Sequence, residues 1–325
     1  MSPNSRRLRR AIAALCLLFT LPAFAQGTFK ITQRIAIPGT GGWDYLTVDE
    51  AARRLYISHG TQVEVVDVDT KALVATIPNT PGVHGVALAP NLGRGFISNG
   101  GNSTVTIFDL KTLKKIADVP TGKKPDAIIY DPSTSQIFAF NGDSESATVI
   151  SAADGKVAGT VPLGGGPEFA VADGKGYVYD NLEDKNEIVK IDARKLTVAA
   201  RWPVAPCEAP SALAMDRPNH RLFIGCRSHL MAVVDSESGK IVATLPIGDH
   251  VDAAAFDEDS KLVFFSNGEG TISVFHQDSP DKYSAVETVK TLPRAKTMAL
   301  DPKTHDLFLS TAEAGNFVVL VVSNK

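Results

Sequence analysis

The feature of this sequence that most restricts its fold is a unit of about 42 residues that recurs along almost the whole chain. Residues 95–122 read GFISNGGNSTVTIFDLKTLKKIADVPTG, and similar stretches precede and follow them. Each unit opens with a short apolar run, and the seven runs read WDYLTVD, VHGVALA, PDAIIYD, PEFAVAD, PSALAMD, VDAAAFD and AKTMALD. Such a period indicates a repeat architecture in which each unit buries its apolar surface against its neighbours.

Each repeat carries four β-strand signals and no helical period. The opening run is followed by a run such as RGFISNG, an alternating run such as STVTIFD and a fourth such as KALVATIP. The residues between the runs are mostly Gly, Asn, Asp and Pro, which favour turns. Four short strands in a unit of this length are typical of a propeller blade. A β-helix is the structural alternative, but its rungs are usually shorter.

The two ends of the chain provide a test of this interpretation. The sequence ends with NFVVLVVSNK, which resembles a third strand with no fourth strand after it. Residues 29–39 read FKITQRIAIPG, which resembles a fourth strand with nothing before it. We therefore predict an all-β, seven-bladed β-propeller of four-stranded antiparallel blades, closed by pairing of residues 29–37 with residues 317–322. Such pairing leaves no open interface between the first and last blades.

The N-terminus has the layout of a secretory signal peptide. A segment with four arginines precedes the apolar run AIAALCLLFTL, and the small-x-small stretch Ala23-Phe24-Ala25 follows it. We predict cleavage after residue 25, a single propeller domain over residues 26–325 and a periplasmic or secreted location. An uncleaved N-terminal anchor is the alternative. After cleavage we expect no membrane span, because no other long apolar segment exists.

The charge of the mature chain narrows the choice of partners. Loss of residues 1–25 removes four arginines and no acidic residue, so the formal net charge falls from −3 to about −7. An acidic surface disfavours phosphate backbones, whose binding depends on Lys and Arg. We therefore expect no nucleic-acid partner.

The stretch GFISNGGNSTVTIFD resembles the YVTN repeat of the YncE-like family of secreted β-propellers. In that repeat the second strand ends in Thr-Asn, a turn of Gly, Ser and Asn follows, and the third strand ends in Ile-Asp. The similarity extends from about Gly39 to the end of the chain. It implies the fold and export but no particular reaction. Some other propeller families are lactonases or lyases with a divalent metal in the channel. This sequence contains no motif of those families by which their site residues could be assigned to positions in this chain.

The second residue of each opening run should project toward the central channel, one from each blade. These seven residues are Asp44, His84, Asp126, Glu168, Ser211, Asp252 and Lys296. Four carboxylates around a narrow axis favour a cation, and His84 would favour a transition metal. Three interpretations stay open: solvated polar caps, a pocket for an organic ligand or peptide, and a metal site.

A second ring is expected at the ends of the second strands. Its members are His59, Asn99, Asn141, Asn181, Cys226, Asn267 and Thr311. The Asn side chains suit turn geometry and are interpreted as structural. His59 departs from that pattern and belongs to the same blade as Asp44. Together with His84 these residues would form a ligand set for Zn²⁺ or non-haem Fe, if the two rings face each other.

The mature chain keeps two cysteines, Cys207 and Cys226. Cys226 ends its strand opposite the start of the opening run of the same blade, and Cys207 lies just upstream of that start. In an oxidising compartment this arrangement predicts one disulfide. The alternative is a free Cys226 thiolate that acts as a metal ligand or redox group.

These observations predict an exported monomer that binds a ligand, a metal ion or a protein partner at the acidic rim of its channel. The partner would be a small ligand or a protein or peptide of the cell envelope. The sequence establishes no cofactor, although it would allow a divalent metal ion. One alternative is a metal-dependent, lactonase-like lyase or hydrolase, with Asp44, His59 and His84 as ligands and Glu168 or Asp252 as general base. Another is a non-catalytic envelope scaffold.

Overall fold

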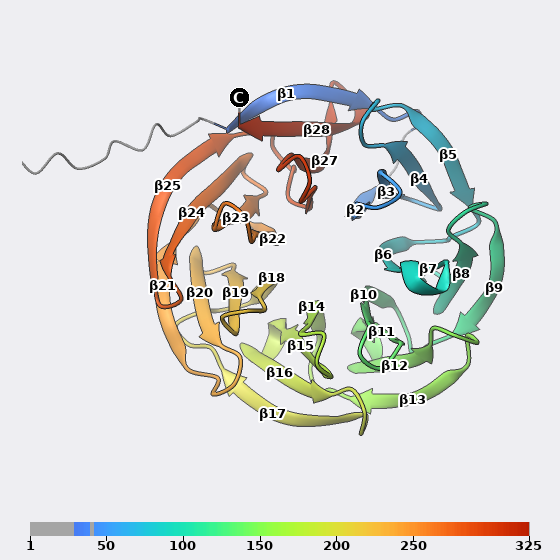
Figure 1. Cartoon of the computed structure of the whole chain (residues 1–325), viewed down its shortest axis with the longest axis horizontal. Helices are drawn as coiled ribbons and strands as arrows, with labels where there is room; N and C mark the ends of the chain where they lie inside the picture. Colours follow the sequence, from blue (N-terminus) through green and yellow to red (C-terminus); the bar gives the residue numbers. More distant parts are fainter. Residues whose placement is uncertain (1–28, 40–41, 325) are drawn as a thin grey trace, which may run out of the picture.

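The computed structural model describes residues 29–39 and 42–324, and this part of the chain forms a ring of seven four-stranded antiparallel sheets (Figure 1). The all-β, seven-bladed propeller predicted from the repeat is therefore confirmed. The proposed signal peptide lies outside the described residues. Within them, no helix has the length and apolar character needed to cross a membrane.

Each blade runs from an inner strand beside the axis to an outer strand at the circumference (Figure 1). The strands of blades 1 to 4 are β2 (Trp43–Asp49), β3 (Arg54–His59), β4 (Gln62–Asp67), β5 (Leu73–Pro78), β6 (Val83–Ala89), β7 (Arg94–Asn99), β8 (Thr104–Asp109), β9 (Lys115–Pro120), β10 (Pro125–Asp131), β11 (Gln136–Asn141), β12 (Ser146–Ser151), β13 (Val157–Pro162), β14 (Pro167–Ala172), β15 (Tyr177–Leu182), β16 (Glu187–Asp192) and β17 (Thr197–Pro203).

Blades 5 and 6 repeat this order, and blade 7 takes its outer strand from the other end of the chain. Their strands are β18 (Pro210–Asp216), β19 (Arg221–Cys226), β20 (Leu230–Asp235), β21 (Ile241–Pro246), β22 (Val251–Asp257), β23 (Leu262–Asn267), β24 (Thr271–Ser279), β25 (Lys282–Lys290), β26 (Met298–Leu300), β27 (Leu307–Glu313), β28 (Asn316–Asn324) and β1 (Phe29–Ala36). Three single-turn 3-10 helices lie in the connections: η1 (Pro90–Leu92), η2 (Gly142–Ser144) and η3 (Glu183–Lys185).

The ring is closed by β1, which pairs antiparallel with β28 along its whole length. Phe29 lies opposite Asn324 and Ala36 opposite Val318, and the Ile37 amide donates to the Phe317 carbonyl at 3.0 Å. The sheet order β1-β28-β27-β26 makes the N-terminal strand the outer strand of blade 7. The predicted joint between the two ends of the chain is confirmed.

The hydrophobic core is divided among the seven interfaces between neighbouring blades. Alternate side chains of a strand point to opposite faces, so each blade buries one face against each neighbour. Between blades 1 and 2, for example, Tyr56, Val63, Ile97 and Phe108 are completely buried in one cluster. Six similar clusters fill the other interfaces. The fixed ring of blades therefore holds the inner strands around one axis.

A disulfide joins Cys207 and Cys226, whose Cα atoms lie 5.4 Å apart. It ties the loop before β18 to the end of β19, and both cysteines are buried. The predicted disulfide is confirmed, and the alternative of a free Cys226 thiolate is wrong.

Candidate functional site

A β-bulge at the start of the inner strands sets the direction of the first predicted ring of side chains. In blades 1 to 3 the register between inner and second strands shifts between Trp43 and Leu46, between Val83 and Val86, and between Pro125 and Ile128. The same shift occurs in blades 4 to 6. A bulge re-aims the side chain of the extra residue. We call the end of the channel where these residues lie the acidic mouth.

Hydroxyl groups of the second strands fix the backbone of the bulged residues in the next blade. Ser58 donates to the carbonyl of His84, and Ser98 donates to the carbonyl of Asp126. Ser266 donates likewise to the carbonyl of Lys296, which precedes the inner strand of blade 7, where no register shift occurs. Each of these serines lies one residue before the end of its strand, in the runs ISHG, ISNG and FSNG. Sequence reasoning missed this role, although the recurring Ser was a visible signal.

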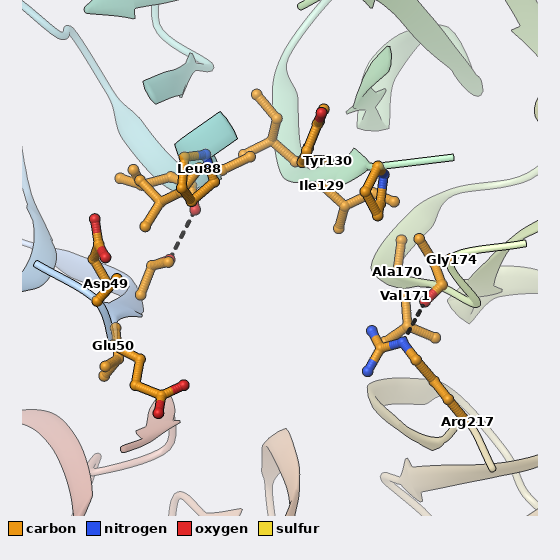
Figure 2. Close-up of a pocket in the computed structure, with 18 residues that line it drawn as sticks. Asp49, Glu50, Leu88, Ile129, Tyr130, Ala170, Val171, Gly174 and Arg217 are labelled. Carbon is orange, nitrogen blue, oxygen red and sulfur yellow. Dashed lines mark hydrogen bonds between the residues drawn. The ribbon is translucent and has the colours of Figure 1, made fainter. Parts of the chain in front are cut away.

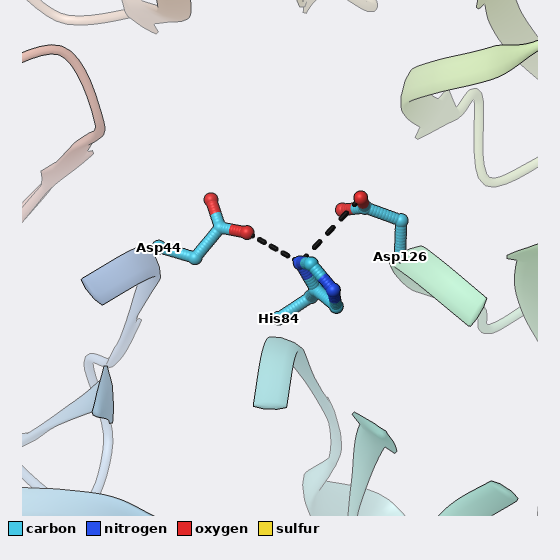
Figure 3. A group of neighbouring side chains, drawn as sticks. All are labelled: Asp44, His84 and Asp126. Atoms are coloured by element: carbon cyan, nitrogen blue, oxygen red, sulfur yellow. Dashed lines mark hydrogen bonds and ion pairs between the residues drawn. The ribbon is translucent and has the colours of Figure 1, made fainter. Parts of the chain in front are cut away.

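Asp44, His84 and Asp126 converge at the acidic mouth, as Figure 3 shows. His84 Nδ1 lies 2.6 Å from Asp44 Oδ2 and 3.5 Å from Asp126 Oδ2, and all three donor atoms lie within 4.8 Å of one another. About a quarter of each side chain is exposed, so solvent and solutes reach the group. A Cβ atom at position 100 would lie 2.7 Å from His84 Nε2, so Gly100 leaves room for the imidazole.

Burial and mutual charge change the protonation of this cluster. Burial and the neighbouring Asp44 charge raise the pKa of Asp126 to about 6. For His84, burial alone would lower the pKa, but the hydrogen bond to Asp44 and the charge of Asp126 together raise it. Below about pH 6 Asp126 is therefore mainly protonated, and the raised pKa of His84 favours its imidazolium form. A metal ion would have to displace these protons, so the cluster suits a cation better as the pH rises.

The ring members of blades 4 and 6 differ from this cluster in their electrostatics. Burial, a hydrogen bond to the Glu183 carboxyl group and nearby negative charges raise the pKa of Glu168 to about 9. Glu168 is therefore protonated at neutral pH. Burial also raises the pKa of Asp252, against the influence of Lys296, whose Nζ lies 2.8 Å from Asp252 Oδ2.

Two of the predicted site residues lie away from the acidic mouth. Ser211 is buried and donates to the Val251 carbonyl at 2.9 Å, so its role is structural. His59 is also buried: its Nδ1 lies 3.3 Å from Glu64 Oε1, and its ring packs on Phe317 with centroids 4.7 Å apart. Among the described residues, the group with metal-ligand spacing contains Asp126 in the place predicted for His59.

The Asn side chains of the second predicted ring have a structural role, but one of the four was assigned to this ring wrongly. Asn99, Asn141 and Asn267 are buried, and each donates to hydroxyl groups of the adjacent third strand. Asn181 does not belong to this ring, because the inner hairpin of blade 4 is shorter and places Leu182 opposite Pro167. Asn181 instead donates to the Ala212 carbonyl of blade 5 at 3.1 Å.

Tyr45 and Phe169 meet across the channel beneath the acidic mouth. The Tyr45 hydroxyl donates to the Glu168 carbonyl at 3.3 Å, and the two aromatic rings lie 5.1 Å apart. Tyr45 belongs to blade 1 and Phe169 to blade 4, which lie on opposite sides of the axis (Figure 1). Burial, followed by the charge of Asp126, raises the pKa of Tyr45, so its hydroxyl stays a donor. We call this pair of aromatic side chains the aromatic floor of the acidic mouth.

Comparison with known proteins identifies the fold but no family and no activity. No family model matches the chain, and no curated protein matches its sequence. A chain of Kuenenia stuttgartiensis hydrazine synthase is similar with a TM-score of 0.77 and 14% identity, over 89% of this chain and 97% of that one.

Two further solved structures are similar. A chain of the mitotic checkpoint complex has a TM-score of 0.80 and 15% identity, over 98% of this chain and 99% of that one. U3-55K has a TM-score of 0.78 and 9% identity, over 89% and 97% of the two chains. Identities this low show the shared propeller fold alone.

Proposed function

We propose that this protein is a non-catalytic binding protein that holds a divalent metal ion at Asp44, His84 and Asp126. The observation that carries the proposal is the convergence of two carboxylates and one imidazole from three successive blades, with donor atoms within 4.8 Å of one another. The propeller supplies the rigid support, because each ligand starts an inner strand whose position is fixed by two blade interfaces.

The spacing of the donor atoms suits a metal ion. An ion about 2.1 Å from each donor separates the donors by about 3.0 Å in octahedral and about 3.4 Å in tetrahedral geometry. His84 Nδ1 already lies 2.6 Å and 3.5 Å from its two carboxylate oxygens. Small side-chain rotations therefore bring all three atoms to metal-binding distance without movement of the strands.

The donor set also indicates the class of ion. Two carboxylates match the charge of a divalent ion, and a single imidazole favours Zn²⁺, Mn²⁺ or Fe²⁺ over Ca²⁺ and Mg²⁺, which prefer oxygen ligands alone. Three protein ligands leave coordination positions open toward the acidic mouth. A small ligand or a side chain of a protein partner could complete the coordination there.

The remaining ring residues favour binding over the lyase or hydrolase alternative. Glu168, with a pKa of about 9, is protonated at neutral pH and so is a poor general base. Asp252 is paired with Lys296 at 2.8 Å. Neither carboxylate is free to accept a proton from a metal-bound water.

We further propose that the chain belongs to the YVTN-repeat, YncE-like propellers and is exported to the periplasm or the medium as a monomer after cleavage of residues 1–25. The repeat GFISNGGNSTVTIFD and the N-terminal layout support this assignment. A disulfide is consistent with an oxidising compartment.

Isothermal titration calorimetry of chelator-treated protein with Zn²⁺, Mn²⁺ and Ca²⁺ tests the metal site. We expect one Zn²⁺ or Mn²⁺ per chain, with Ca²⁺ weaker. His84→Gln and Asp126→Asn should each weaken binding by about tenfold or more, because removal of one ligand in three leaves an incomplete site. Asp252→Asn is the matched control from the same mouth: it removes a nearby charge but no ligand atom, so the loss of affinity should be much smaller. Absence of metal binding, or equal losses in all three variants, would refute the proposal.

A further inference from the structure

The channel has a second opening, at the end opposite the acidic mouth, and a cavity of about 640 Å³ lies there (Figure 2). The inner strands begin at the acidic mouth, so the turns that follow them mark the other end. Glu50, Pro90, Pro132 and Gly174 belong to those turns and line the cavity. We call this opening the far mouth. The aromatic floor formed by Tyr45 and Phe169 lies between it and the acidic mouth.

The wall of the far mouth is mainly apolar. The wall includes Leu88, Ile129 and Val171, which come from the inner strands of three successive blades. All three side chains are only partly buried. Tyr130 also lines the cavity. Its hydroxyl group donates to Asn91 Oδ1 at 3.0 Å, so the ring is the part of this side chain that is left to contact a ligand. A cavity of several hundred cubic ångströms with such a wall is typical of sites for small organic molecules.

Two charged side chains face each other across this cavity (Figure 2). Arg217 Nε donates to the Ala172 carbonyl at 2.9 Å, which orients the guanidinium group. Among the described residues, its two terminal nitrogens make no hydrogen bond or ion pair, and Figure 2 shows them directed into the cavity. On the opposite side Glu50 makes no hydrogen bond or ion pair with the part of the chain that the structure describes, whereas the Asp49 carboxylate accepts from the Ala52 amide in its own turn.

From this geometry we propose that the far mouth is a second binding site, specific for an apolar monocarboxylic acid. The carboxylate of the ligand pairs with the terminal nitrogens of Arg217, since a guanidinium group binds a carboxylate through two parallel hydrogen bonds. The apolar body lies against Leu88, Ile129 and Val171. Glu50, on the opposite wall, repels a second negative charge, so the site discriminates against dicarboxylates.

Calorimetric titration of the purified protein with decanoate tests this site. We expect saturable binding of decanoate, with decanedioate at least about tenfold weaker because its second carboxylate would face Glu50. Arg217→Gln should weaken decanoate binding by about tenfold or more, because it removes the charge that pairs with the carboxylate. Arg194→Gln is the matched control: Arg194 is also exposed in a turn at this end, donates to the Lys175 carbonyl and does not line the cavity.

Two further variants keep the result unambiguous. Val171→Phe fills part of the cavity and should weaken decanoate binding without any change of charge. Asp126→Asn should leave decanoate binding unchanged, because Asp126 belongs to the other mouth. No saturable binding of decanoate would overturn the proposal, as would equal affinity in wild type and Arg217→Gln. Neither result bears on the metal site, which is measured separately.

Discussion

Replacement of Glu168 by glutamine should stabilise the protein, and the gain should grow as the pH rises from 4 to 8.5. The cause is the unusual environment of this carboxyl group, which is largely buried, hydrogen-bonded to Glu183 and close to other negative charges. Its pKa is about 9 in the folded protein, against an ordinary value of 4.5. The folded state therefore keeps a proton that the unfolded chain releases.

The sign and size of the effect follow from proton linkage. Below pH 4.5 both states are protonated, and Glu168 has no pH-dependent effect on the free energy of unfolding. Between pH 4.5 and about 9 the unfolded chain binds fewer protons than the folded protein, so this free energy falls by about 1.4 kcal/mol per pH unit. At pH 7 the loss amounts to about 3 kcal/mol. Glutamine does not ionise, so the variant escapes this loss while its amide can still donate to Glu183.

Urea unfolding of the wild type and Glu168→Gln at pH 4, 7 and 8.5 measures the effect. We expect similar midpoints at pH 4 and a higher midpoint for the variant at pH 7, with a larger difference at pH 8.5. Glu145→Gln removes an exposed carboxylate from a nearby connection and serves as the control, for which we expect no such trend. A difference between wild type and Glu168→Gln that is the same at every pH would show that Glu168 is not protonated in the folded protein.

Two other predictions concern covalent features of the chain. Cys207→Ala combined with Cys226→Ala removes a cross-link with a sequence separation of 19 and should lower the free energy of unfolding by about 3 kcal/mol; unchanged urea midpoints would contradict this estimate. Mass spectrometry of the exported protein should give the mass of residues 26–325 less two hydrogens for the disulfide, and the mass of the full chain would contradict cleavage after residue 25.

Much of the fold could be predicted from the sequence because it depends on repetition. Seven apolar runs at a regular spacing, the first six each followed by three more strand signals, determine the number of blades. The unpaired strand patterns at the two ends predict the closure, since β1 completes the blade that β28 leaves unfinished. The cysteine pair was predictable because the inner hairpin of blade 5 places Cys226 beside the loop that carries Cys207.

The candidate site was only partly predictable, because strand signals do not reveal register shifts. Alternation alone cannot locate the bulges that turn Asp44, His84 and Asp126 into the acidic mouth. A hairpin shorter by one residue moved Asn181 out of the second ring. His59 points into the interface between blades 7 and 1, where Phe317 covers it. This direction depends on packing between blades distant in sequence.

The features of the channel axis were not predictable for the same reason. Tyr45 meets Glu168 across the axis, at a sequence separation of 123 residues. Arg217 of blade 5 meets a cavity whose other walls belong mainly to blades 1 to 4. Contacts across a ring depend on its diameter and on which side chains are long enough to span it. The sequence of a single repeat determines neither the diameter of the ring nor which side chains meet across it.

The pairing of β1 with β28 sets a time order for biogenesis. The first strand of the ring is synthesised first, yet its partner is the last strand to be made. Until residues 316–324 are available, the backbone groups of β1 that pair with β28 have no partner, and the interface between blades 7 and 1 is not formed. In a chain exported N-terminus first, β1 would emerge before its partner, and truncation within residues 316–324 would leave the ring open and the core between blades 7 and 1 incomplete.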